Sequence, residues 1–201
     1  MKFDLHMHTS RHSPDSQMDP FDLVRRAKEL GLDGVVITEH DWLWTKAELE
    51  ELRAAMPGLV VLAGIEVSAR EGHFLAYGVL DPFALPRGIG VNALCQEVHR
   101  QGGAVVAAHP FRWGQPFLDI LRREKPELDG LEMMTSNMDS DCRQRAAEAR
   151  RQWKLTGLGS SDAHQSEVLG CCYTEFEANI ESNQDLVVAI RGGRALPRER
   201  E

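Results

Sequence analysis

Short aliphatic and β-branched runs alternate with helix-like segments along most of this 201-residue chain. The run Gly34-Val35-Val36-Ile37-Thr38 has the composition of a strand that is buried on both faces. Before it, Asp19-Pro20 is a typical helix start, and Gly31 is a typical helix end. The expected strands are 2–8, 34–38, 59–67, 73–78, 104–108, 130–134, 155–159 and 171–176, and the expected helices are 20–30, 45–56, 91–101, 116–123, 139–153 and 183–191. This alternation predicts an α/β protein built from βα units, with a mostly parallel sheet.

Length and composition predict one domain, residues 1–201, with 42% hydrophobic and 27% charged residues. No apolar run approaches the ~18 residues of a membrane span, and the N-terminus lacks the apolar core of a signal peptide. The four cysteines form no CxxC pair. We therefore expect a cytoplasmic protein with reduced thiols and no membrane partner. The formal net charge of −8 argues against an extended nucleic-acid surface.

Histidines and carboxylates gather at the ends of the expected strands. Two residues apart on one strand, His6 and His8 point to the same face and could grip a metal ion together. In parallel βα architectures, functional groups collect at the C-terminal ends of the strands. The candidate metal ligands are His6, His8, Asp15, His40, Glu66, His73, His109, Asp162 and His164. Imidazole and carboxylate donors suit Zn, Mn or Fe.

The order of these motifs resembles a known family. The chain contains D-L-H-M-H, a downstream aspartate, T-E-H, G-I-E-V, G-H, A-H-P and S-D-A-H, in that order. Together they resemble the PHP family of metal-dependent phosphoesterases, named for polymerase-associated domains and histidinol phosphatase. The resemblance extends over residues 2–194. It implies a distorted (β/α)7-type barrel, a single domain that carries a metal cluster at the C-terminal ends of its strands.

The resemblance also implies how the ligands are shared among two to three divalent transition metal ions. His6, His8 and Asp162 would hold the first ion, and Glu66 would bridge it to a second ion. The other proposed ligands are His73 and His109 for the second ion, and Asp15, His40 and His164 for the third. Residue His12 is the alternative to Asp15 as the ligand from the first loop. Glu66, Asp162 and His164 are the expected catalytic residues.

The expected activity is hydrolysis of a small phosphate ester, most simply a monoester, by a hydroxide that bridges two of the ions. Six neutral imidazoles and three carboxylates carry −3, and three divalent ions would bring the site to roughly +3, which favours an anionic substrate. Arg112 and His12 are the candidate substrate contacts. The alternatives are a metal-dependent amide or ester hydrolase, a PHP-like exonuclease, and a non-catalytic metal-stabilised interaction domain.

Four further residues carry expectations of their own. Asp4 shares the strand face of His6 and could orient a ligand histidine, or could have a simple polar role. His99 is expected on the solvated face of a helix. Trp42 and Trp44 follow His40 and could either line a pocket or pack in the core.

Overall fold

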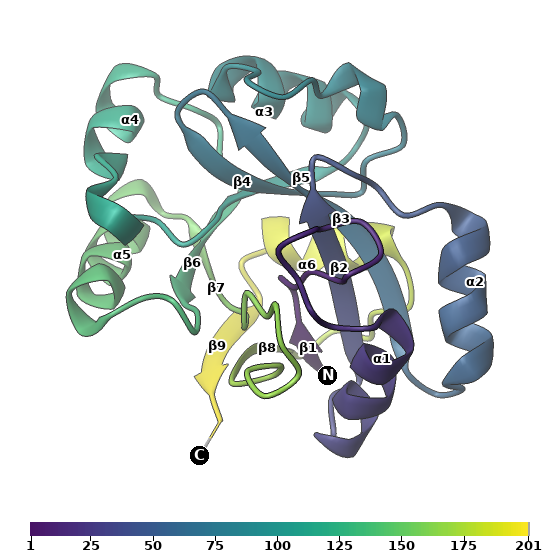
Figure 1. Ribbon diagram of the computed structural model, residues 1–201. Helices are drawn as coiled ribbons and strands as arrows, with labels where there is room; N and C mark the ends of the chain where they lie inside the picture. The colour runs from purple at the N-terminus through teal and green to yellow at the C-terminus, as the bar shows by residue number, and fades with distance from the viewer. Residues whose placement is uncertain (201) are drawn as a thin grey trace.

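The computed structural model describes residues 1–200 and contains a nine-stranded sheet that is nearly closed into a barrel, with helices around it (Figure 1). The strands are β1 (Lys2–Asp4), β2 (Gly34–His40), β3 (Val60–Ala69), β4 (Gly72–Tyr77), β5 (Ala104–Ala107), β6 (Gly130–Met134), β7 (Thr156–Gly159), β8 (Cys172–Phe176) and β9 (Ala195–Glu199). The helices are α1 (Pro20–Glu29), α2 (Lys46–Ala55), α3 (Val91–Arg100), α4 (Phe117–Arg123), α5 (Ser140–Trp153) and α6 (Asn183–Arg191), with short 3₁₀ turns at Pro82–Ala84 and Arg112–Gly114. In the part of the chain that is described, no helix has the length and apolar character that crossing a membrane requires.

The strand order is β7-β6-β5-β4-β3-β2-β1-β8-β9. Two groups of three strands, β1-β2-β3 and β5-β6-β7, are parallel, as expected. Strand β4 runs antiparallel to both β3 and β5, and β8 runs antiparallel to both β1 and β9. The expectation of a mostly parallel sheet is therefore wrong at these strands. Only two residues, Arg70 and Glu71, join β3 to β4, and a connection this short permits only a hairpin.

The reversal of β4 decides where His73 lies. Its position opposite Ser68 puts the start of β4 beside the C-terminal end of β3. His73 therefore shares an edge of the sheet with the C-terminal ends of the parallel strands, although it begins its own strand.

The barrel is closed by the segments that follow β1 and β7. Met7 and Ala163 form an isolated parallel bridge. The amide of Asp162 donates to the carbonyl of His6 at 2.9 Å, and the amide of His8 donates to the carbonyl of Ala163 at 2.9 Å. The expected strand 2–8 is thus a short strand, β1, followed by this bridge. The pairing places the H-M-H and S-D-A-H motifs side by side.

Local signals confirm most of the expected helix boundaries. Asp19 caps α1, and Thr45 with Glu48 forms the expected capping box of α2. Strand β9 was not expected from the sequence. It is an edge strand that contains Pro197, pairs with β8, and has an exposed, charged end.

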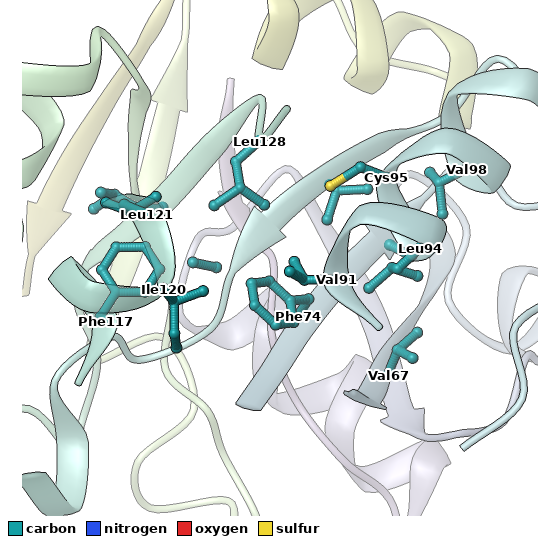
Figure 2. Close-up of a cluster of buried hydrophobic side chains, with 14 of the residues drawn as sticks. Val67, Phe74, Val91, Leu94, Cys95, Val98, Phe117, Ile120, Leu121 and Leu128 are labelled. Atoms are coloured by element: carbon teal, nitrogen blue, oxygen red, sulfur yellow. The ribbon is translucent and has the colours of Figure 1, made fainter. Parts of the chain in front are cut away.

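Apolar packing fills the barrel and the space between sheet and helices. Figure 2 shows side chains of α3, among them Val91 and Leu94, packed beside Phe74 of β4. In the same view, Phe117 and Ile120 of α4 belong to the same buried cluster. A second buried cluster joins strand residues to α6 and includes Phe3, Leu5, Tyr77, Val106, Leu158, Leu186 and Ile190. The candidate ligands lie outside these clusters, at the end of the barrel where β2 and β3 have their C-terminal ends.

Candidate metal centre

The structure brings all nine predicted ligands together at one end of the barrel. They come from the loops after β1, β5 and β7, from the ends of β2 and β3, and from the start of β4. Seven of these ligands line one cavity of about 580 Å³: Asp15, His40, Glu66, His73, His109, Asp162 and His164. His6 and His8 lie beneath it and are fully buried.

A first group of donors surrounds one point. The Nε2 atoms of His6 and His8 lie 3.1 Å apart. His6 Nε2 is 3.3 Å from Asp162 Oδ1 and 3.5 Å from Glu66 Oε2, and the corresponding distances from His8 Nε2 are 3.5 and 3.3 Å. Donors bound at about 2.0–2.2 Å in a tetrahedron lie roughly 3.4 Å from one another. These four atoms therefore have the spacing of a metal-binding tetrahedron.

The carboxylate of Glu66 faces a second group with its other oxygen. Glu66 Oε1 lies 2.9 Å from His73 Nδ1 and 3.0 Å from His109 Nε2. Glu66 Oε2 is buried and has no aligned hydrogen-bond donor, although imidazole nitrogens of His6, His8 and His40 lie within 3.5 Å. A buried carboxylate oxygen that three imidazole nitrogens approach without an aligned hydrogen bond has the surroundings that a shared divalent cation would satisfy. This carboxylate is therefore suited to bridge two ions.

A third group lies nearer the surface. Asp15 Oδ2 is 3.1 Å from His40 Nε2 and 3.3 Å from His164 Nε2. His12 does not join this group, because its Nε2 bonds to Glu48 Oε1 at 2.7 Å. Of the two loop candidates, Asp15 is the one that the fold brings to His40 and His164.

Without bound cations, negative charge dominates the electrostatics of the centre. Burial alone would lower the pKa of His6, but the carboxylates of Asp162, Glu132 and Glu66 raise it well above its ordinary value. For Glu66 and Asp162, burial opposes ionisation, yet the adjacent His6 and other imidazoles hold both pKa values below the ordinary range. The centre thus draws in positive charge, and divalent cations would provide it.

Glu132 is a supporting residue that the sequence analysis missed. Its side chain is fully buried in β6, where Oε1 lies 3.0 Å from His6 Nδ1 and Oε2 accepts the amide of His109 at 2.6 Å. Ser160 Oγ also donates to this carboxylate. Glu132 therefore orients one ligand and fixes the backbone of another. The available signal was a single carboxylate in the otherwise apolar strand G-L-E-M-M.

Glu39 and Asp4 hold the loops that carry ligands. Buried Glu39 accepts hydrogen bonds from the amide of Thr9 at 3.0 Å, from Ser13 Oγ and from Trp44 Nε1 at 2.9 Å. Asp4 accepts the amides of Ser161 and Gly170, both at 2.9 Å, and burial raises its pKa to about 6. Asp4 therefore positions the loop of Asp162 rather than a histidine ring.

Arg112 reaches the centre from the loop after β5. Its Nη1 donates to Asp162 Oδ2 at 2.9 Å, and Asn137 Nδ2 donates to the same oxygen at 2.9 Å. The guanidinium stacks on Trp113 at 3.8 Å. Together these contacts leave Oδ1 of Asp162 turned toward His6 and His8. That Arg112 also contacts a substrate remains a prediction.

Three further expectations are settled by contacts. His99 is half-buried and bonds to Asp129 Oδ2 at 2.8 Å, so the expectation of a solvated side chain is wrong. Asp129 lies 30 residues after His99 in the sequence, so only the fold brings the two side chains together. Trp44 packs in the core, whereas Trp42 is exposed and stacks on His12.

Comparisons with known proteins agree with this architecture. A family model described as PHP-associated matches residues 143–195. MJ1587, an uncharacterised protein of Methanocaldococcus jannaschii, is 27% identical over 150 residues, which cover 68% of this chain and 82% of that protein. An error-prone DNA polymerase of Cutibacterium acnes is 42% identical over 65 residues, which cover 32% of this chain and 6% of the polymerase.

A solved two-domain structure from Bacteroides vulgatus, which contains a predicted PHP-like metal-dependent phosphoesterase, superposes with a TM-score of 0.75 and 22% identity. The match covers 100% of this chain and 65% of that one. The fold of this chain is thus that of the PHP-like structure, and its residues 143–195 match the PHP-associated family model. The resemblance noted in the motifs and the expected barrel fold are thereby confirmed.

Proposed function

We propose that this protein hydrolyses a small phosphate ester, in the simplest case a monoester, with two or three Zn, Mn or Fe ions at the centre described above. One observation carries the proposal: nine imidazole and carboxylate side chains, from segments far apart in sequence, converge around one cavity. A purely structural role would not require so many donors to face an accessible cavity.

The donor set fits divalent transition metals. His6, His8 and Asp162 would hold one ion, His73 and His109 a second, with Glu66 between them. The third group is Asp15, His40 and His164. Such ions, when bound, lower the pKa of water and neutralise charge on phosphoryl oxygens. Asp162 is held in place by Arg112 and Asn137, and Glu132 prevents rotation of the His6 ring.

The charge and size of the site support a small anionic substrate. Three carboxylates and three divalent ions give roughly +3, which attracts phosphate more than a neutral amide. A cavity of about 580 Å³ is of a size that suits a small molecule. Two arginines, Arg87 and Arg112, line the cavity, and Arg112 is the one whose guanidinium reaches a candidate ligand, Asp162. The chain has 31 acidic against 23 basic residues and no basic run to follow a polymer.

A second candidate function is hydrolysis of nucleic-acid phosphodiesters. The local similarity to an error-prone DNA polymerase favours it. This activity would use the same centre, but its substrate would be a polynucleotide rather than a small ester.

A parallel activity screen distinguishes the two candidates. Protein loaded with Mn²⁺ or Zn²⁺ is incubated with small phosphate monoesters, including mononucleotides, and with single-stranded DNA. We expect turnover of at least one small monoester, and a loss of about 10³-fold or more in Asp162→Asn, which removes a donor on which the centre depends. The matched control is Glu124→Gln, an exposed carboxylate outside the lining of this cavity. Degradation of DNA without turnover of any small phosphate would favour the second candidate instead.

A further inference from the structure

His12 and Glu48 form a hydrogen-bonded pair on the wall of the same cavity. His12 Nε2 lies 2.7 Å from Glu48 Oε1, and His12 lines the cavity together with Asp15 and His164. Among the cavity-lining histidines of residues 1–200, His12 alone lies outside the nine candidate ligands. The metal centre therefore leaves this imidazole free for another task.

The ring of His12 is held by aromatic neighbours. It stacks on Trp42 with ring centroids 5.1 Å apart and planes at 28°, and it meets the edge of Trp44 at 5.4 Å and 89°. The guanidinium of Arg11 lies 5.1 Å from the centroid of the Trp44 ring. A ring fixed in this way presents one nitrogen in a defined direction.

The contact with Glu48 determines which of the two ring nitrogens of His12 remains free. Its Oε2 accepts the amide of Thr45 at 2.8 Å and the Thr45 hydroxyl at 2.7 Å, which leaves Oε1 for His12. Burial raises the pKa of Glu48, but the hydrogen bonds from Thr45 and His12 outweigh it and hold the pKa below its ordinary value. An ionised carboxylate accepts, so Nε2 of His12 is the donor. Across residues 1–200, Nδ1 of His12 takes part in no hydrogen bond.

We propose that His12 is the general acid that protonates the leaving group of the substrate, and that Glu48 is its positioning residue. The inference rests on the proposed phosphate-ester hydrolysis. A water oxygen forms a bond to phosphorus while the bond from phosphorus to the ester oxygen breaks, and the ester oxygen keeps the electron pair. The Nδ1–H of the imidazolium gives its proton to that oxygen and releases an alcohol. Water loses one proton to solvent, and solvent returns a proton to His12.

The chain offers a matched control for this pair. His99 Nε2 lies 2.8 Å from Asp129 Oδ2, and Asp129 also accepts a backbone amide, as Glu48 does. The exposed side-chain fractions are 19% and 21% for His12 and Glu48, and 23% and 13% for His99 and Asp129. His99 lies outside the cavity lining. His99→Gln therefore reproduces the loss of a histidine–carboxylate contact without touching the site.

The experiment compares two aryl phosphates that differ in leaving group. 4-Nitrophenyl phosphate releases a stable anion that needs no proton, whereas phenyl phosphate releases a basic oxygen that does. For His12→Gln we expect kcat on phenyl phosphate to fall by about 100-fold or more, and kcat on 4-nitrophenyl phosphate to stay within about threefold. Glu48→Gln should show the same selectivity with a smaller loss, and His99→Gln should leave both activities unchanged. Metal content per chain should equal that of the unaltered protein in all three variants.

Equal losses on both esters, or no loss on either, would overturn the role of His12 while leaving phosphate-ester hydrolysis intact. A loss accompanied by reduced metal content would also overturn it, because His12 would then support the centre. If the unaltered, metal-loaded protein hydrolysed neither these esters nor any other monoester, the proposed function would fail, and this inference with it.

Discussion

At the scale of single residues, Glu66 is the side chain that links two of the donor groups. Its two oxygens face different donor groups, and one oxygen has no hydrogen bond among the described residues. Three buried carboxylates, Glu132, Glu39 and Asp4, hold candidate ligands and their loops in place. Two predictions concern residues at this scale.

The first is that Glu132→Gln weakens metal binding. The substitution keeps the size of the side chain but replaces a carboxylate that contacts His6, the His109 amide and Ser160. A glutamine cannot satisfy all three partners, so ligand orientation is lost. Supporting partners of metal ligands are worth about 10–100-fold in affinity, and we expect a loss in that range by isothermal titration with Zn²⁺. Glu124→Gln is the control, and an unchanged dissociation constant in Glu132→Gln would contradict the role given to Glu132.

The second prediction concerns pH. Burial would lower the pKa of His40, but the carboxylates of Glu66 and Asp15 beside its two ring nitrogens raise it to about 9 in the metal-free protein. A metal ligand must be a neutral imidazole, so below pH 9 the ion displaces a proton from His40. Metal affinity should therefore rise with pH between 6 and 9, by up to about tenfold per pH unit for each proton released. Titrations in buffers of different ionisation enthalpy measure that release. An affinity that is flat over this range would contradict a ligand role for His40.

At the scale of elements, strand pairing positions the ligands. Strand β4 brings His73 to the cavity because it runs in the reverse direction, and the Met7–Ala163 bridge brings Asp162 beside His6. These placements depend on a correct register of β1 against β2. In that register Phe3 lies opposite Gly34.

We predict that Gly34→Ala destabilises the protein for this reason. A Cβ on Gly34 would lie 2.2 Å from Cε1 of Phe3, whose ring is fully buried and packs edge-on against Phe176. The ring cannot move aside without disturbing its neighbours, and overpacking of this kind costs about 1–3 kcal/mol. Urea unfolding should show a lower midpoint with an unchanged slope. A midpoint equal to that of the unaltered protein would show that β1 can shift to accept the methyl group.

At the scale of the whole molecule, we expect metal binding and folding to be linked. The ligands come from both ends of the chain, since Asp162 and His164 meet His6 and His8 through barrel closure. The unfolded chain does not hold these groups together. An ion that binds the folded centre therefore stabilises the fold by mass action.

Removal of metal should accordingly lower the melting temperature. At an ion concentration about 100 times Kd, the stabilisation is about 2.7 kcal/mol, which corresponds to roughly 5–11 °C for a chain of 201 residues. Scanning calorimetry of metal-loaded and chelator-treated protein measures the difference. The difference should be smaller in His6→Ala, which lacks a donor of the first group. A chelator-independent melting temperature would contradict a centre that holds ions in the folded protein.

The amino-acid sequence by itself determined the helix starts at Asp19 and Thr45, the alternation of strands and helices, and the nine candidate ligands. These signals are local. A capping box is formed by two residues that lie three positions apart, and the end of a strand is indicated by the residues next to it. The order of ligand motifs was also readable, because a family resemblance depends on the types and order of residues.

Only the tertiary structure decided which partners these residues meet. The choice of Asp15 over His12 depends on Glu48, which is 36 residues from His12. The role of Glu132 depends on a contact with His6 across 126 residues, and the reversed β4 and the edge strand β9 depend on neighbouring strands. Contacts between residues so far apart arise from strand pairing and barrel closure, and neither the periodicity nor the composition of a short segment encodes them.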